Sequence, residues 1–312
     1  MAVPAETFQT YQGVVNREDL SNVVYNISPT ETPFMSAIGR GKASNTLHEW
    51  TRDELAVAEN NAAVEGDNTA RTAITPGERI NNRTQISKKA PAISGTQQKA
   101  SSAGNLYTMG AQVAKAMKEI KRDVEFALTQ NTTAVTGDAT TARQLRGLEG
   151  WIATNNNLAA DGVAPDPQTN TPPTDGTARG FDEDQLKDVI QQCWDEGGSP
   201  DMIMVGGVNK QVFSGFNGGA TQFANADDKR LVSTIDVYVS DFGSLKVVPN
   251  RFQRPRTAFV IDASMFSVDY LRPYMVNNLA KTGDSDAKQL VVEYTLRCGN
   301  EKASGAIRDL TT

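Results

Sequence analysis

Residues 104–130, "GNLYTMGAQVAKAMKEIKRDVEFALTQ", carry the strongest helical pattern of the chain. Apolar side chains recur there every three or four residues, while most of the basic side chains fall on other faces. The apolar positions are Val113, Met117, Ile120, Val124, Ala127 and Leu128. About 26 helical residues would span roughly 40 Å at 1.5 Å per residue. The pattern therefore predicts a long spine around which the rest of the fold is arranged.

The segment before this helix is broken by residues that oppose regular structure. In "NISPTETPFMSAIGRGKASNTLHEW", residues 26–50, two prolines and two glycines interrupt a short apolar stretch. Proline lacks the backbone N–H donor, and glycine loses more conformational entropy than other residues when it is ordered. We therefore expect no helix or strand here that could build a core. Residues 1–45 are therefore predicted to form an extended arm. Its apolar side chains, Ile27, Phe34, Met35 and Ile38, are nevertheless unusual for a free tail.

Residues 46–100 have the pattern of a long hairpin. "TLHEWTRDEL" (46–55) and "RINNRTQISKKAPAISGTQ" (79–97) resemble strands, and a polar stretch connects them. Few apolar residues are present to hold this excursion against a core, so we expect it to be mobile on its own.

The part of the chain after the helix predicts a compact α/β lobe. Residues 161–176, "DGVAPDPQTNTPPTDG", have the composition of a surface loop. A helix is expected next, with Asp182 and Gln185 at the spacing of a capping box and an apolar stripe on one face. The stripe contains Leu186, Val189, Ile190, Cys193 and Trp194. "GVNKQVFSGF" suggests a second, short helix. Strands are predicted in "DMIMV", "STIDVYVS", "SLKVVPN", "TAFVIDA", "KQLVVEYTLRC" and "SGAIRDL". The fold class is therefore α+β.

Composition and charge restrict the class of protein. The chain has 312 residues, 38% of them hydrophobic, with no membrane-length apolar run and no recognisable leader, so we expect a soluble product made in the cytoplasm. Residues 71–122 hold ten Lys/Arg and two Asp/Glu, a net of +8, whereas residues 1–70 hold four and ten, a net of −6. The basic block could bind nucleic acid or be an ordinary solvated face. Because it contains one aromatic residue, Tyr107, we favour a third interpretation, in which acidic and basic segments of neighbouring copies meet.

No motif for catalysis or metal binding is found in the sequence. His48 is the single histidine, and Cys193 and Cys298 are far apart, so a zinc site, a Cys/His pair and a disulfide are not expected. "DFG" at residues 241–243 occurs without the other kinase motifs and between two strand patterns, where it is typical of a turn. We predict no enzymatic activity and no cofactor.

The order of these segments resembles the major capsid proteins of tailed double-stranded-DNA phages, which share the Hong Kong 97 type fold. Three stretches resemble the SU10-like family within this group more closely. They are "ISPTETPFMSAIG…HEW" (27–50), "QLRGLEGWI" (144–152) and "KQLVVEYTLRCGNEKASGAI" (288–307).

The resemblance implies a division of the chain into the parts of that fold. These are an N-terminal arm (1–45), an extended loop (46–100), a peripheral domain with the spine helix and a β-sheet (101–145 and 257–300), and an axial α/β domain (146–256 and 301–312). It also implies contacts between subunits. For the arm these are Ile27, Pro29, Pro33, Phe34 and Ile38, which would pack on neighbours rather than in their own core. For the extended loop they are Trp50, Arg79, Arg83, Lys88 and Lys89.

The implied function is self-assembly into pentamers and hexamers of an icosahedral or prolate shell around phage DNA, which is held without sequence recognition. The implied location is the virion, after synthesis and assembly in the host bacterial cytoplasm, with no membrane partner. Because the arm motif begins within thirty residues of Met1, a separate scaffolding protein is expected, with a portal and a decoration protein as further partners. Two alternatives remain at this point. One is an encapsulin-like compartment shell, and the other is a hydrolase with its site in residues 180–255.

Overall fold

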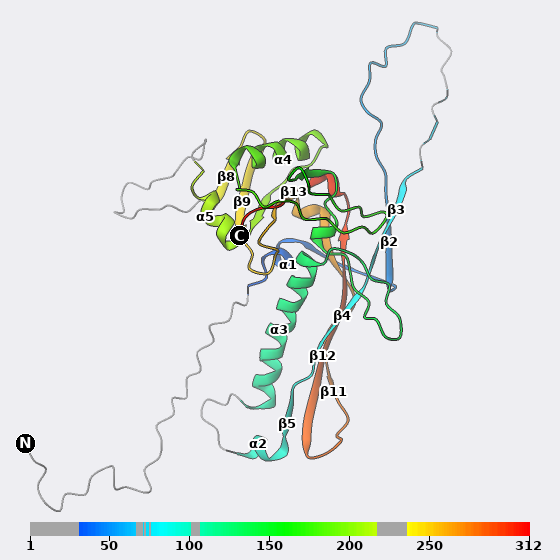
Figure 1. Ribbon diagram of the computed structural model, residues 1–312. Helices are drawn as coiled ribbons and strands as arrows, with labels where there is room; N and C mark the ends of the chain where they lie inside the picture. Colours follow the sequence, from blue (N-terminus) through cyan, green and yellow to red (C-terminus); the bar gives the residue numbers. More distant parts are fainter. Residues whose placement is uncertain (1–30, 67–70, 72, 75, 101–106, 217–235) are drawn as a thin grey trace, which may run out of the picture.

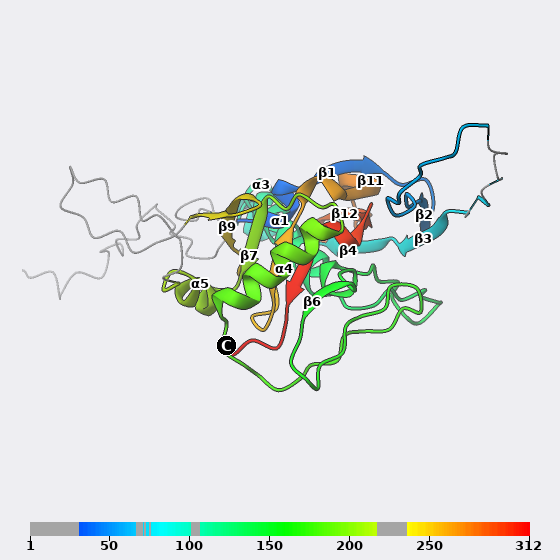
Figure 2. The same ribbon diagram turned by 90° about the horizontal axis from the view of Figure 1, so that it is seen from above.

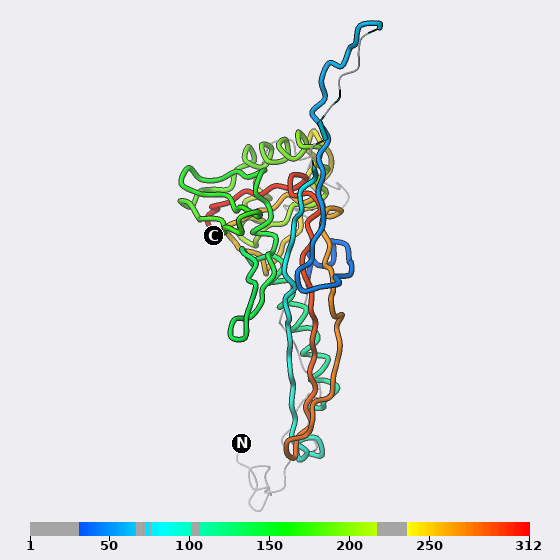
Figure 3. Tube along the Cα trace, turned by 90° about the vertical axis from the view of Figure 1, so that its right-hand side faces the viewer, coloured from blue at the N-terminus to red at the C-terminus, as the bar shows by residue number. Residues whose placement is uncertain are grey.

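The computed structural model describes residues 31–66, 71, 73–74, 76–100, 107–216 and 236–312. A long helix runs beside a long antiparallel pair of strands, and a compact lobe with two further helices lies at one end of both (Figure 1). A narrow hairpin projects beyond this lobe, as the view from the side shows (Figure 3). The molecule therefore has an elongated body with one protruding hairpin.

The predicted spine is confirmed as α3 (Met109–Gln130). The Thr108 hydroxyl accepts a hydrogen bond from the Ala111 N–H, which caps the first turn. Ile120, Val124 and Leu128 are fully buried, as their spacing predicted. The helix begins later than residue 104, and residues 104–106 lie outside the described part of the chain.

The spine packs on a five-stranded sheet in the order β1-β11-β12-β4, with β5 also paired to β12. Its strands are β1 (Gly39–Lys42), β4 (Gln85–Lys89), β5 (Ala92–Ser94), β11 (Phe266–Asn278) and β12 (Ser285–Cys298). We predicted β12 but not β11, because Pro273 and the polar residues around it do not favour a strand. β4 and β5 belong to this sheet, so the projecting hairpin is shorter than residues 46–100.

The N-terminal segment differs most from the prediction. Residues Pro33–Ala37 form a short helix, α1, and Phe34, Met35 and Ile38 are buried in the core that surrounds the spine. The backbone N–H groups of Phe34 and Met35 each donate to the Glu125 carboxylate at 2.8 Å. A buried carboxylate thus satisfies the free donors of the first helical turn. The expectations that this stretch builds no core and that Phe34 and Ile38 pack on a neighbour are wrong.

The motif "QLRGLEGWI" connects the spine to the compact lobe, and its backbone lies very close to the backbone at the end of the spine. A Cβ atom at Gly150 would lie 2.0 Å from the Thr132 carbonyl oxygen, and one at Gly147 would lie 2.7 Å from that of Ala127. Only glycine fits at these two positions. Leu145, Leu148, Trp151 and Ile152 are then buried beside the end of the spine.

The lobe is built on a six-stranded sheet in the order β6-β13-β10-β7-β9-β8. Its strands are β6 (Asn155–Asn157), β7 (Met202–Val205), β8 (Val237–Ser240), β9 (Gly243–Pro249), β10 (Ala258–Ile261) and β13 (Gly305–Ile307). The fold also contains the short elements α2 (Gly95–Lys99), η3 (Leu148–Gly150), η4 (Ala263–Met265) and η5 (Glu301–Ala303).

Successive residues of β7 and β10 face two different hydrophobic cores. Met204 and Phe259 face the spine, whereas Ile203 and Val260 face the helices α4 (Glu183–Asp195) and α5 (Gly207–Phe213). Figure 2 shows α4 and α5 on one side of β7 and β9 and α3 and α1 on the other. Both faces of the central strands are therefore covered, which explains their continuous apolar sequences.

Local predictions for α4 and the "DFG" triplet are confirmed, with one change. Asp182 and Gln185 form the predicted capping box, and residues 241–243 lie at the turn between β8 and β9, where Gly243 has a φ of +146°. Trp194, however, is 55% exposed and does not join the buried stripe. Its ring instead contacts that of Phe242, with the centroids 5.2 Å apart.

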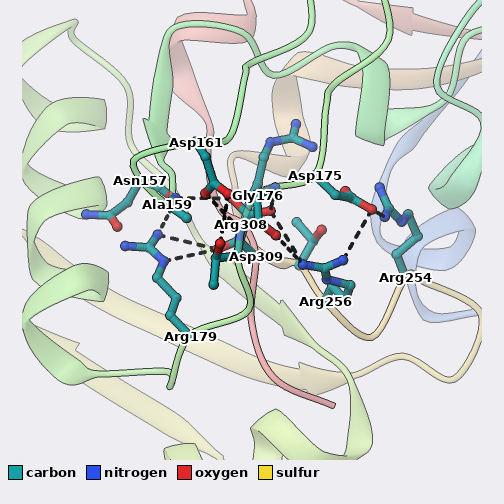
Figure 4. A network of polar contacts seen from close by, with 12 residues as sticks. Asn157, Ala159, Asp161, Asp175, Gly176, Arg179, Arg254, Arg256, Arg308 and Asp309 are labelled. Carbon is teal, nitrogen blue, oxygen red and sulfur yellow. Dashed lines mark hydrogen bonds and ion pairs between the residues drawn. The ribbon is translucent and has the colours of Figure 1, made fainter.

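A charged network fastens the long loop of residues 158–178 to the C-terminal segment (Figure 4). The Arg308 guanidinium donates to Glu149 at 2.6 Å, and both side chains are buried. The Asp309 carboxylate accepts hydrogen bonds from the backbone N–H groups of Ala159 and Gly176. The loop that looked like a free surface segment is thus held by buried charge on its inner side.

Candidate interaction surfaces

The projecting hairpin consists of β2 (Leu47–Arg52) and β3 (Glu78–Arg83), which pair antiparallel as predicted. Trp50 fixes the hairpin to the body. Its indole N–H donates to the Cys298 carbonyl at 2.8 Å, and its ring lies 5.6 Å from that of Trp151. We expected Trp50 to contact a neighbouring subunit, but it packs within its own chain, because a hairpin with few apolar residues needs an aromatic anchor.

The end of the hairpin has no such anchor. We call residues 53–66 the acidic tip, because they hold four carboxylates and no lysine or arginine. Leu55, Val57 and Val64 are 98%, 91% and 80% exposed. Figures 1 and 3 show the tip extending beyond the lobe. Apolar side chains this exposed, on a segment that leaves its own body, are typical of a surface that another molecule covers.

The four basic residues predicted to contact a neighbour do not form one patch. Arg79 pairs with Glu49 across the hairpin. The Lys89 ammonium lies 3.0 Å from the Asp123 carboxylate of the spine. Lys88 is exposed on β4, and Arg83 is half-buried at the base of the hairpin. Two of the four therefore already have partners in their own chain.

A cavity of about 680 Å³ lies at the base of the hairpin. We call it the root cavity. β3 and residues of the loop after the spine form parts of its wall, and the ring of Trp151 also lines it. Its charged lining residues are Arg52, Glu78, Arg79, Arg83, Arg146, Asp166, Glu301 and Lys302. Sequence reasoning did not find this cavity, because its walls come from three distant segments.

The residues considered for chemistry have structural partners. The His48 Nε2 atom lies 2.9 Å from a carboxylate oxygen of Asp269. Cys193 and Cys298 are buried and not bonded to each other, and burial raises the pKa of Cys193 to about 12. In the described part of the chain, no group of His, Cys, Asp or Glu side chains is arranged to hold a metal ion. No helix among the same residues is long and apolar enough to cross a membrane.

The remaining predicted contact residues belong to the arm. Pro33 occupies the first turn of α1, where the missing N–H of proline costs nothing. Ile27 and Pro29 lie outside the described residues. The sequence did not reveal the role of Glu125, which accepts the hydrogen bonds of α1. The one feature that could have indicated a buried carboxylate is its position next to Val124 in the buried half of the helix.

Comparison with known structures identifies the fold. The cyanophage A-1(L) capsid subunit matches with a TM-score of 0.68 at 12% identity, over 97% of this chain and 99% of that chain. A subunit of a native GTA particle capsid matches with a TM-score of 0.63 at 11% identity, over 97% and 98% of the two chains. A Mycobacterium phage Bobi chain matches with a TM-score of 0.61 at 12% identity, over 96% and 98% of the chains. The fold is the Hong Kong 97 type, as predicted.

Comparison of sequences identifies the family. The major capsid protein of Escherichia phage Phieco32 is 26% identical over 339 aligned positions, which cover 96% of each chain. The family model of the SU10 major capsid protein matches residues 4–311. None of these matches supports a compartment shell or a hydrolase. The chain therefore belongs to the SU10 major capsid protein family, and it is a structural protein of a phage capsid.

Proposed function

We propose that the chain assembles into pentamers and hexamers that close a shell around double-stranded DNA, and that the acidic tip reaches over a neighbouring subunit. The observation that carries this proposal is the exposure of Leu55, Val57 and Val64 on a hairpin that leaves its own body. Burying apolar area contributes about 25 cal/mol per Å², so three such side chains favour an intersubunit contact. Repetition over many copies multiplies this modest gain.

The other partners follow from the same proposal. DNA is held without sequence recognition, because the chain has a net charge of −6 and base readout needs contacts that a bulk container does not make. A separate scaffolding protein directs curvature, and a portal and a decoration protein complete the head. Assembly takes place in the host cytoplasm before the DNA is packaged.

The test is assembly of a tip variant beside the wild-type chain. Both are expressed alone and together with the other head proteins of the phage, and the particles are examined by electron microscopy. We expect closed shells from the wild-type chain. When Leu55, Val57 and Val64 are all replaced by serine, we expect the subunit to fold, because the exposed tip has no role in its core. We expect this variant to remain as soluble capsomers or monomers, because the contact between subunits is lost. Normal shells from this triple variant would contradict the role of the tip.

A matched control separates loss of contact from loss of fold. Val163, Val208 and Val237 are also more than half exposed but lie on other elements. Replacing these three with serine makes the same kind of change on other exposed surfaces. Both variants should unfold at the wild-type temperature, and only the tip variant should fail to close shells.

A further inference from the structure

Two of the basic residues that line the root cavity have no carboxylate partner, although Glu78, Asp166 and Glu301 also line it. Five of its lining residues are basic, and three of these have a carboxylate partner. Arg52 lies 2.7 Å from Glu78, and Lys302 lies 3.1 Å from Glu54. Arg79 pairs with Glu49. The two others, Arg83 and Arg146, have no carboxylate oxygen within 4 Å among the described residues.

Of these two arginines, Arg146 gives the stronger argument for a missing anion, because its side chain is buried and the residue is only 4% exposed. One guanidinium nitrogen, Nη2, donates to the Asn170 side chain at 2.7 Å, and the group lies 4.8 Å from the centre of the Trp151 ring. The other, Nη1, is buried and has no hydrogen-bond acceptor. Burial lowers the pKa of Arg146 to about 10, although the charge of Asp166 opposes this change. A buried cation with an unused donor favours a nearby anion.

The acidic tip carries carboxylates, which are the partners that Arg83 and Arg146 lack within the described subunit. Glu59 and Glu65 are exposed, and neither has an ion-pair partner among the described residues. One carboxylate of the subunit's own tip, that of Glu54, already pairs with Lys302 at the margin of the cavity. The apolar residues of the tip also match a cavity whose wall includes Ile80 and Trp151.

The tip that fills the cavity must come from another copy. Residues 52, 78–81 and 83 at the base of the hairpin line the cavity, whereas the hairpin beyond Glu54 extends away from the lobe (Figures 1 and 3). We propose that the root cavity of one subunit binds the acidic tip of a second subunit, with Glu59 and Glu65 pairing with Arg83 and Arg146. This inference rests on the proposed function, since it names the surface on which the tip lands.

A charge exchange tests the pairing. Arg83 is the residue to change, because its side chain has no hydrogen bond or ion pair within the described subunit, whereas reversal of Arg79 or Lys89 would also break pairs inside the subunit. We expect Arg83→Glu to reduce the yield of closed shells at least tenfold, and the double variant Glu59→Lys/Glu65→Lys to do the same. Combining Arg83→Glu with a single tip reversal, either Glu59→Lys or Glu65→Lys, should restore most of the yield in one of the two combinations, because the other tip carboxylate still pairs with Arg146. Lys246→Glu, an exposed change of equal charge on β9, is the matched control and should assemble normally.

A second measurement does not depend on assembly. A synthetic peptide of residues 53–66 is titrated into the unassembled Arg83 and Arg83→Glu subunits while tryptophan fluorescence is recorded, because Trp151 lines the cavity. We expect saturable binding to the wild-type subunit that weakens at least tenfold with the variant subunit or with a peptide carrying Gln at positions 59 and 65. Thermal unfolding of each variant verifies that it is folded.

Two results would overturn the inference. One is normal shells from Arg83→Glu together with peptide binding that the substitution leaves unchanged. The other is failure of both combined variants to recover although their subunits unfold at the wild-type temperature. Failure of the wild-type chain to form shells with its own head proteins would instead contradict the proposed function.

Discussion

Glu125 is a buried carboxylate that connects the N-terminal segment to the spine and to the lobe. Its oxygens accept the N–H groups of Phe34 and Met35, and Oε1 also accepts the Asn250 side-chain amide at 2.8 Å. Three donors from two other segments therefore depend on one side chain. Each buried donor left without a partner costs about 1–3 kcal/mol.

We predict that Glu125→Ala lowers the free energy of unfolding of the unassembled subunit by about 3–5 kcal/mol, since three donors lose their acceptor. Urea denaturation followed by circular dichroism measures the change. Glu119→Ala is the control on the same helix, because Glu119 makes half-exposed pairs near 4 Å with Lys89 and Lys115. Its cost should stay below about 1 kcal/mol. Equal effects of the two substitutions would contradict the role of Glu125.

The same residue predicts a pH dependence. Burial raises the pKa of Glu125 above 4.5, although the hydrogen bonds from Met35, Phe34 and Asn250 oppose the rise. The folded state then binds this proton more tightly than the unfolded state, so the contribution of Glu125 to stability increases as the pH falls through the folded-state pKa. The difference in free energy of unfolding between wild type and Glu125→Ala should widen from pH 7 towards pH 4.5 and then stay constant. A difference that narrows over this range would contradict the assignment.

At the scale of elements, α1 and β1 lie in the segment that we predicted to be an extended arm, and both pack against the body of the subunit. Phe34 packs edge-on against Phe266, with the ring centroids 6.0 Å apart, and Gly39 to Lys42 pair in parallel with Ser267 to Tyr270. The core therefore starts no later than Pro33, which lies inside the predicted arm of residues 1–45.

Two deletions distinguish this boundary from the predicted one. Removal of residues 1–40 takes Phe34, Met35 and Ile38 out of the core, and large-to-small core changes cost about 2–5 kcal/mol each. We expect this deletion to abolish cooperative unfolding, because the sum approaches the whole stability of a domain. Removal of residues 1–30 should leave a folded, soluble subunit with impaired assembly. Calorimetry gives the first result and electron microscopy the second. A folded subunit after the longer deletion would restore the predicted boundary.

The spine gives a second prediction at this scale. Val124 is fully buried in α3, so Val124→Asp places an unpaired charge in the core and should cost at least about 3 kcal/mol. Lys118→Asp changes an exposed position of the same helix and should cost less than about 0.5 kcal/mol. Urea denaturation of both variants measures the two values. An effect of Val124→Asp as small as that of Lys118→Asp would contradict the position of the spine.

At the scale of the whole molecule, charges of both signs are left without a partner. The acidic tip lies at the far end of the hairpin (Figure 3), whereas Arg83 and Arg146 in the root cavity and Lys88 on β4 have no ion-pair partner among the described residues. Within one subunit these groups are far apart, so their charges contribute little to its fold. Between subunits they attract each other, and a closed shell repeats that attraction many times.

We therefore predict that added salt slows assembly and leaves the subunit fold unchanged. Exposed ion pairs contribute about 0–1 kcal/mol each and are screened over about 10 Å at 0.1 M salt. Between about 0.05 and 0.5 M salt, the assembly rate measured by light scattering should fall several-fold, while the melting temperature of the unassembled subunit changes by only a few degrees. Faster assembly at high salt would show that apolar contacts alone control the rate.

The sequence by itself determined the elements whose signals are local. The spine, the capping box of α4, the hairpin and most of the lobe strands follow from apolar period and turn residues, and so does the interpretation of "DFG" as a turn. The resemblance of three short stretches was enough to identify the family. Each of these features depends on residues within a few turns or strands of one another.

Only the tertiary structure decided where isolated residues go. Phe34 and Ile38 join the core because Glu125, about ninety positions later, supplies the acceptor that a short helix needs. β11 forms because β12 and β1 pair with its edges, which compensates for Pro273. The root cavity exists because β3, the loop after the spine and the C-terminal segment meet there. Such contacts join positions far apart in the chain, and no local pattern of residues encodes them.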